Sequence, residues 1–125
     1  MNWTAIGAVL MTLGVGMGAF GAHALKGRLD EYSLSVYEKA VFYHFIHALG
    51  ILLIALLARA GVVSAAGGNR AAWLLAIGIL LFSGSLYALA LSGTRLLGAI
   101  TPFGGVAFIA GWILLAYEAV RAQRA

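Results

Sequence analysis

Two histidines three residues apart are the strongest candidates for chemistry in this sequence. His44 and His47 lie inside a long apolar stretch, where ionisable side chains are costly and usually face the protein interior or water. A spacing of three places both side chains on one face of a helix. Because imidazole titrates near neutral pH and binds transition metals, the pair suits proton transfer, small-molecule recognition or metal ligation.

Other polar side chains are expected at the same depth. If the apolar stretches cross a membrane alternately up and down, residues distant in sequence come together near the connections 26–39 and 93–96. Glu38 would then lie at the mouth of a polar layer in one leaflet. The candidate ligand-binding residues of this layer are His23, His44, His47, Ser83, Ser85, Tyr87 and Thr101.

Three interpretations of the layer are open. The histidines can be structural groups that hydrogen-bond across helices, with His23 lying at the lipid headgroups. The layer can instead bind a small molecule or lipid, or pass a proton. In the third interpretation, His44 and His47 ligate a metal together with His23, or His23 and His44 ligate a haem, although no acidic ligand is expected within the apolar stretches. The cofactor, if there is one, is unknown from the sequence.

The sequence contains no strong catalytic motif. Ser83-Gly84-Ser85 lacks the strand–turn–helix context of a nucleophile elbow. The glycines of 14–21 lie in an apolar stretch without the lysine of a phosphate loop. The absence of cysteine excludes disulfides, iron–sulfur clusters and thiolate metal sites. We therefore expect a protein that is not an enzyme.

Four long uncharged stretches must position the layer. Each has about the 20 apolar residues that a helix needs to cross a bilayer, and in lipid the backbone must satisfy its own hydrogen bonds. Only 10% of residues are charged, against about 25% in a soluble domain. The sequence predicts an all-α membrane protein, a single domain over 1–125 in which four transmembrane helices form an antiparallel bundle. The stretches are Asn2–Leu25, Ala40–Ala58, Ala71–Ser92 and Leu96–Tyr117.

Basic residues are scattered over the connections, so the formal charge of +4 does not indicate nucleic acid as a partner. We call side A the membrane side with both termini and the connection 59–70, and side B the side with 26–39 and 93–96. Each side carries four Lys or Arg residues, so this count does not fix the orientation. Our working assignment places side A in the cytoplasm. No cleaved signal peptide is expected, because no basic residue precedes a long apolar run.

Glycines in the first stretch predict a closely packed helix. Gly14, Gly18 and Gly21 share one face, and Gly14-x-x-x-Gly18 is a small-xxx-small motif that lets helix backbones approach. Two uses of this face are open: packing within the bundle, or a seam between copies of the chain.

Helix boundaries can also be predicted from local signals. Ser35 and Glu38 fit a capping box at the start of the second helix, preceded by an amphipathic turn over 30–37 in the membrane interface. The connection 59–70 contains Gly67-Gly68-Asn69 and is typical of a flexible loop.

The only proline indicates where the fourth helix begins. Either the helix starts at Leu96 and kinks near Pro102, or Thr101 is its N-cap and Pro102 its first residue. We prefer the second interpretation, in which 96–100 is a tight hydrophobic connection.

Several motifs resemble one known family. They are Gly18-Ala19-Phe20-Gly21-Ala22-His23-Ala24-Leu25, Tyr43-His44-x-x-His47-Ala48-Leu49, Phe82-Ser83-Gly84-Ser85-Leu86-Tyr87 and Ile100-Thr101-Pro102-Phe103-Gly104-Gly105. In this order they resemble the small inner-membrane family called domain of unknown function 423, which includes bacterial YgdD and eukaryotic transmembrane protein 256. The resemblance implies four transmembrane helices in the plasma or bacterial inner membrane. It implies no activity.

These observations predict an integral membrane protein, with the lipid bilayer as its environment. The favoured function is non-enzymatic binding or passage of a small molecule or lipid at the His/Ser/Tyr layer. A structural or assembly subunit of a larger membrane complex, or a homo-oligomer, is the alternative, suggested by the small size and the glycine face. A His-ligated metal or haem protein is the remaining alternative.

Overall fold

The chain is helical along almost its whole length in the computed structural model, which describes residues 1–124. Four spans are long and apolar enough to cross a membrane, and no strand occurs in this part of the chain. The predicted all-α class with four membrane-spanning helices is therefore confirmed. The spans are Trp3–Leu25, Glu31–Arg59, Ala65–Ser92 and Arg95–Arg124.

Helix α2 (Glu31–Arg59) forms the second span alone, whereas the other three spans are composite. Helix α1 (Trp3–Phe20) continues into a π-helical turn, and a second π-helical turn joins α3 (Ala65–Gly78) to α4 (Gly84–Ser92). A short 3-10 turn precedes α5 (Thr101–Arg124). The π-helical turns are Gly21–Leu25 and Ile79–Ser83, and the 3-10 turn is Arg95–Ala99.

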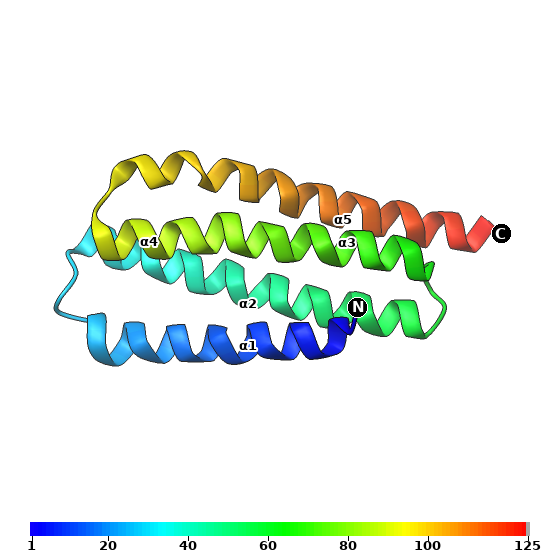
Figure 1. The fold of residues 1–125 in the computed structure, drawn as a ribbon, viewed down its shortest axis with the longest axis horizontal. Coiled ribbons are helices and arrows are strands. Elements are labelled where there is room, and N and C mark those ends of the chain that lie inside the picture. The colour runs from blue at the N-terminus through cyan, green and yellow to red at the C-terminus, as the bar shows by residue number, and fades with distance from the viewer. Residues whose placement is uncertain (125) are drawn as a thin grey trace.

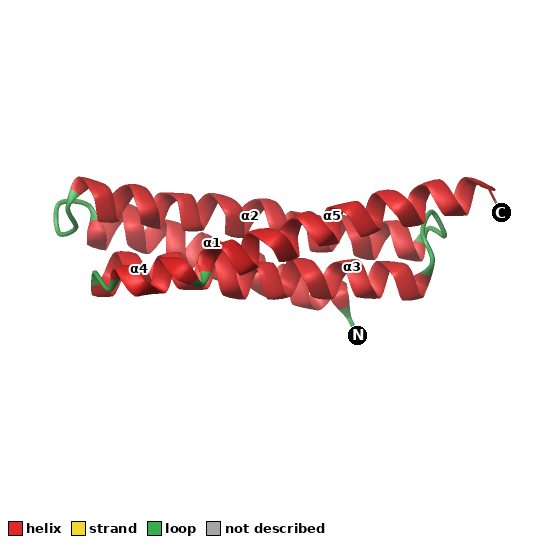
Figure 2. Ribbon diagram, turned by 90° about the horizontal axis from the view of Figure 1, so that it is seen from above, coloured by secondary structure: helices red, strands yellow, loops and turns green. Residues whose placement is uncertain are grey.

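The spans run antiparallel along one long axis. Figure 1 shows them in the order α1, α2, α3–α4 and α5, and the packing contacts follow the same order. The connection 60–64 and the end of α5 lie at one end, side A, and the connections 26–30 and 93–94 lie at the other end, side B (Figures 1 and 2).

The two inner spans carry most of the buried surface. In the most apolar window of each span, 44% of residues are buried in the second and third spans, against 17% in the first and 22% in the fourth. The outer faces of α1 and α5 expose apolar side chains such as Val15 and Ile109, which suit contact with lipid. The inner pair is therefore the core to which α1 and α5 attach.

The second helix begins earlier than predicted, so the capping box at Ser35 and Glu38 is wrong. Asp30 is the N-cap, and its carboxylate accepts a hydrogen bond from the Ser33 N–H at 2.6 Å. This bond lowers the pKa of the Asp30 carboxyl, so the cap is complete above the ordinary Asp pKa and is lost as the pH falls through the lowered value. The Ser35 hydroxyl instead donates to the Tyr32 carbonyl inside the helix.

The flexible loop predicted over 59–70 is also wrong. Ser64 caps α3, accepting a hydrogen bond from the Gly67 N–H at 3.0 Å, so the helix includes the glycines that suggested a loop. Gly67 and Gly68 are buried in the first turns of α3. A side chain at Gly67 would overlap the Glu118 carboxyl of α5, so the glycine serves close packing instead of a turn.

The fourth helix begins within one residue of the preferred interpretation, but the prediction that Thr101 is its N-cap is wrong. The α-helix begins at Thr101, one residue before Pro102, and Ile100 separates it from the 3-10 turn. The connection over 96–100 is therefore mostly a 3-10 turn. The Thr101 hydroxyl bonds to Ser85 of α4.

Gly104 lets α5 cross the π-helical turn Ile79–Ser83 at short range. A methyl group on Gly104 would overlap the backbone nitrogen and Cα of Phe82. The next residue, Gly105, has room, because a Cβ there would lie 3.9 Å from the Phe82 ring. The crossing therefore depends on one of two adjacent glycines.

We predict that Gly104→Ala lowers the free energy of unfolding by about 1–3 kcal/mol, the usual cost of overpacking a close contact. Gly105→Ala is the matched control and should be neutral or slightly stabilising, because alanine favours a helix over glycine. An SDS unfolding titration in detergent micelles, followed by tryptophan fluorescence, measures both. Equal midpoints for the two variants would contradict the close crossing.

Candidate functional site

His44 links three of the spans. Its Nε2 lies 2.8 Å from the carbonyl oxygen of Leu10 in α1, and its Nδ1 lies 3.0 Å from the hydroxyl of Tyr87 in α4. Because a carbonyl only accepts, Nε2 carries the proton and Nδ1 accepts the hydrogen bond from Tyr87. Both nitrogens of this buried ring are therefore satisfied within the protein.

His47 packs against a different neighbour from His44. Its Nδ1–H donates to the Tyr43 carbonyl at 2.7 Å, one turn earlier in α2. The ring stacks on Phe108 of α5 with 3.4 Å between ring centroids, and the Trp112 ring lies 6.0 Å away. The structure thus directs one histidine towards α1 and α4 and the other towards α5, and does not bring the two imidazoles into one cavity.

The hydroxyl groups of the layer are also bonded internally. Ser83 is fully buried, and its hydroxyl donates to the Ala40 carbonyl of α2 at 2.8 Å. The Ser85 hydroxyl donates to the Phe82 carbonyl at 3.0 Å, and Thr101 donates to Ser85 at 2.7 Å. These bonds tie the α3–α4 span to α2 on one side and to α5 on the other.

His23 lies apart from this network. It is exposed on the π-helical turn Gly21–Leu25, at the side B end of the first span. Within residues 1–124, no three His, Asp or Glu side chains come together in a way that could hold a metal ion. The structure therefore does not assemble the three histidines as one ligand set.

The polar layer is therefore a structural frame: its hydrogen bonds hold the helices together. Across residues 1–124, no fully buried side-chain nitrogen or oxygen lacks a hydrogen-bond partner. A ligand that used His44 or Ser83 would have to displace bonds that already join helices, and the unpaired group left behind would be costly in lipid.

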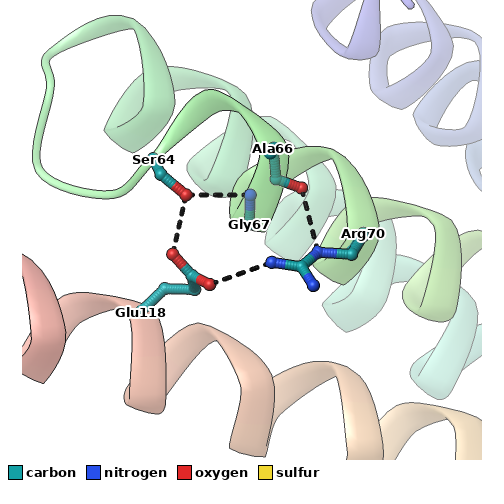
Figure 3. Close-up of polar contacts among 5 residues, drawn as sticks. All are labelled: Ser64, Ala66, Gly67, Arg70 and Glu118. Atoms are coloured by element: carbon teal, nitrogen blue, oxygen red, sulfur yellow. Dashed lines mark hydrogen bonds and ion pairs between the residues drawn. The ribbon is translucent and has the colours of Figure 1, made fainter.

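A second polar cluster, on side A, was not predicted. Figure 3 shows the Glu118 carboxylate of α5 directed at the N-terminus of α3. Its Oε2 accepts from the Ser64 hydroxyl at 2.7 Å, and its Oε1 lies 3.2 Å from Nη2 of Arg70. Glu118 is 3% exposed, whereas the Arg70 side chain is 61% exposed, so the pair joins a buried acid to a base that reaches solvent or headgroups.

The sequence did contain a signal for this cluster. Glu118 is the only acidic residue after Glu38, and it directly follows the predicted apolar stretch Leu96–Tyr117. An isolated acid at the end of a span needs a partner, and Arg70 begins the apolar part of the third span. The expectation that no acidic side chain lies within the spans is therefore wrong.

Two grooves lie beside α1, and neither is lined by the histidines or serines of the layer. The side B groove, of about 330 Å³, runs between α1 and α2. The side A groove, of about 700 Å³, lies where the start of α1 meets the end of α2 and the start of α3. The side B groove is lined by Gly18, Gly21, Ala22, Tyr37, Glu38, Val41, Phe42 and Phe45.

Comparison with known proteins gives one consistent result. Residues 17–105 match the family described as "Protein of unknown function (DUF423)". A UPF0382 membrane protein of Staphylococcus haemolyticus is 49% identical over 110 residues, which cover 88% of each chain. The UPF0382 membrane protein YwdK of Bacillus subtilis is 48% identical over 118 residues, which cover 93% of this chain and 94% of the relative. No solved structure matches the chain.

We predict that Glu118→Ala lowers the free energy of unfolding by about 2 kcal/mol, the usual loss for a hydrogen-bonded charged group. Glu118→Gln should lose less, because its amide oxygen can still accept from Ser64. Glu38→Ala, which removes an exposed carboxylate, is the control. The comparison uses unfolding midpoints in detergent micelles, and a Glu118→Ala midpoint equal to that of Glu38→Ala would show that the cluster does not hold α5 to α3.

Proposed function

The chain belongs to the DUF423 family of membrane proteins, whose function is unknown, and we propose that it is a non-enzymatic module that binds a lipid in the side B leaflet. The observation that carries this proposal is the side B groove, a mainly apolar groove between α1 and α2 with the Glu38 carboxylate at its mouth. The protein is an integral protein of the plasma or bacterial inner membrane, so lipid is its most abundant available ligand.

The walls of the side B groove suit an acyl chain. Gly18 of α1 and Ala22 of the π-helical turn that follows have little side-chain volume, and Val41 and Phe45 of α2 form the opposite wall. Phe42, at the edge, is 60% exposed and faces the surrounding lipid. A chain from the bilayer can therefore enter the groove without breaking any hydrogen bond of the protein.

The polar layer supports this groove from behind. Tyr37 lines the groove, lies against Gly21, and donates its hydroxyl to the Met17 carbonyl of α1. Its ring lies 5.2 Å from the ring of Tyr87, which is bonded to His44. The proposed role of the layer is therefore to fix the position of the groove wall, and not to contact the ligand.

The Glu38 carboxylate indicates which class of lipid headgroup would bind in the side B groove. It is exposed at the side B mouth of the groove, and within residues 1–124 the only ion pair joins Arg70 and Glu118. An unpaired carboxylate favours a hydrogen-bond donor with positive charge. We therefore propose a lipid with an amine headgroup, such as phosphatidylethanolamine.

The glycine face of α1 favours this proposal over a seam between copies of the chain. Gly14 and Gly21 are buried, with the Phe45 and Tyr37 rings of α2 beside them. At Gly14 and Gly21 this face is already packed against α2, so a seam between copies of the chain would have to use another surface.

We predict that Gly18→Leu fills the side B groove and reduces labelling of α2 by a diazirine-bearing phosphatidylethanolamine at least severalfold. A Cβ at Gly18 would make ordinary contacts, 3.6 Å from Val41 and 3.8 Å from Phe45, so the bundle should tolerate the change. Gly16→Leu is the matched control, because Gly16 is on the exposed surface of α1 with nothing near its Cβ position.

The labelled peptide, identified by mass spectrometry from protein in nanodiscs, decides the outcome. Labelling at 41–45 that is lost in Gly18→Leu and kept in Gly16→Leu supports the proposal. Equal labelling of the two variants would reject it.

Glu38→Gln, with Glu31→Gln as its control, should reduce the preference for phosphatidylethanolamine over phosphatidylcholine if the headgroup assignment is correct.

A further inference from the structure

The side A groove has a different chemical character from the side B groove. Figure 1 shows that α1 begins short of the side A end of α2, and the groove lies in this region. Ala58 of α2 and the exposed Met1 form an apolar wall above the buried Ile54 and Ala55, and Arg59 and Asn69 also line the groove. Its volume of about 700 Å³ is within the usual range for small-molecule sites.

The charge at this groove is positive. Arg59 is exposed at the last position of α2, and within residues 1–124 the only ion pair uses Arg70 instead. No Asp or Glu lines the groove, and the nearby Glu118 is held by Ser64 and Arg70. An anion at the rim would therefore meet one free guanidinium and no opposing carboxylate.

Asn69 adds a directed donor to the rim. Its Oδ1 accepts a hydrogen bond from Nε1 of Trp3 at 2.8 Å, which fixes the amide and leaves its Nδ2 as the free group. Trp3 is itself held edge-on against Trp73, with 5.2 Å between ring centroids. Tryptophan is enriched at the headgroup level of a membrane, which places this end of the bundle there.

Three carbonyl groups in the last turn of α2 already accept hydrogen bonds. The turn after the helix returns N–H groups to them: Ala60 donates to Leu56, Val62 to Leu57 and Gly61 to Ala58, at 2.9–3.3 Å. These oxygens are thus engaged with the backbone, and an approaching anion does not meet them as free acceptors.

We infer that the side A groove binds an anionic phospholipid, with its phosphate at Arg59 and Asn69 and one acyl chain against Met1 and Ala58. The depth fits, because Arg59 ends a membrane span, where headgroups lie, and the apolar wall continues from it into the span. The site is independent of the proposed side B function: it lies at the other end of the bundle, recognises an anionic group instead of an amine, and shares no lining residue with the side B groove.

The tryptophans supply the readout. Trp3 lines the groove and Trp73 packs on it, so a bromine-labelled lipid bound there should quench their fluorescence. The full-length protein in detergent micelles is titrated with dibrominated phosphatidylglycerol and, separately, with dibrominated phosphatidylcholine. We expect phosphatidylglycerol to quench at lower concentration.

Arg59→Gln should reduce this preference about fivefold, the effect of one basic residue at a lipid surface. Arg121→Gln is the matched control, because it removes the same charge at the same membrane side, from an exposed position of α5 outside the groove. Arg121→Gln should keep most of the preference.

Thr4→Phe, which fills the groove from its exposed edge, should weaken quenching by both lipids. Thr12→Phe, further along the exposed face of α1, should not weaken it.

Three results would overturn the inference. The first is equal quenching by the two lipids in the native protein. The second is an equal loss of preference in Arg59→Gln and Arg121→Gln, which would mean that the general charge of side A attracts the lipid. The third is complete displacement of the phosphatidylglycerol signal by millimolar inorganic phosphate, which would mean that the site holds a soluble anion. None of these results depends on the labelling of the side B groove.

Discussion

The lack of hydrogen-bond partners in lipid is the constraint on which the rest of this structure depends. Every polar side chain inside the bundle must find its partner within the chain, and the available partners lie mostly on a neighbouring helix. The resulting bonds connect all four spans. They join Tyr37 to Met17, His44 to Leu10 and Tyr87, Ser83 to Ala40, Thr101 to Ser85, and Glu118 to Ser64 and Arg70.

Small residues make these bonds possible. Hydroxyl and imidazole groups reach a neighbouring backbone only where two helices are close, and glycine supplies that closeness at Gly104 against Phe82 and at Gly67 against Glu118. The small side chains on α1 have a second consequence. Where only small residues or the start of α1 cover α2, the surface of α2 remains open as a groove. The polar frame and the two grooves are therefore products of one packing pattern.

The spans could be predicted because length and hydropathy alone determine them, and the side B depth of Ser83, Ser85 and Thr101 followed from their alternating direction. The partners could not be predicted. A spacing of three places His44 and His47 near one another on a helix, but it does not say that α1 and α4 meet one ring while α5 meets the other. That assignment depends on how each helix is rotated about its own axis.

The wrong boundaries have a common physical cause. Asp30 and Ser64 each cap a helix that runs beyond its apolar stretch, and glycines at 67–68 are tolerated in α3 because close packing against α5 and α2 requires them. Local propensity assigned these segments to a turn and a loop, and tertiary packing overrode it. Glu118 was missed for the related reason that a hydropathy count ends at the first charge, although that charge is buried.

Solid-state NMR of the protein in lipid bilayers tests the central claim most directly, through the dipolar contact between the His44 Nδ1 and the Tyr87 ring carbon that bears the hydroxyl. The hydrogen bond of 3.0 Å between these side chains predicts a strong cross-peak, and no contact from His44 to lipid acyl chains. If the cross-peak is absent and the His44 ring contacts acyl chains or exchanges protons with water, the polar side chains do not form the internal frame described above.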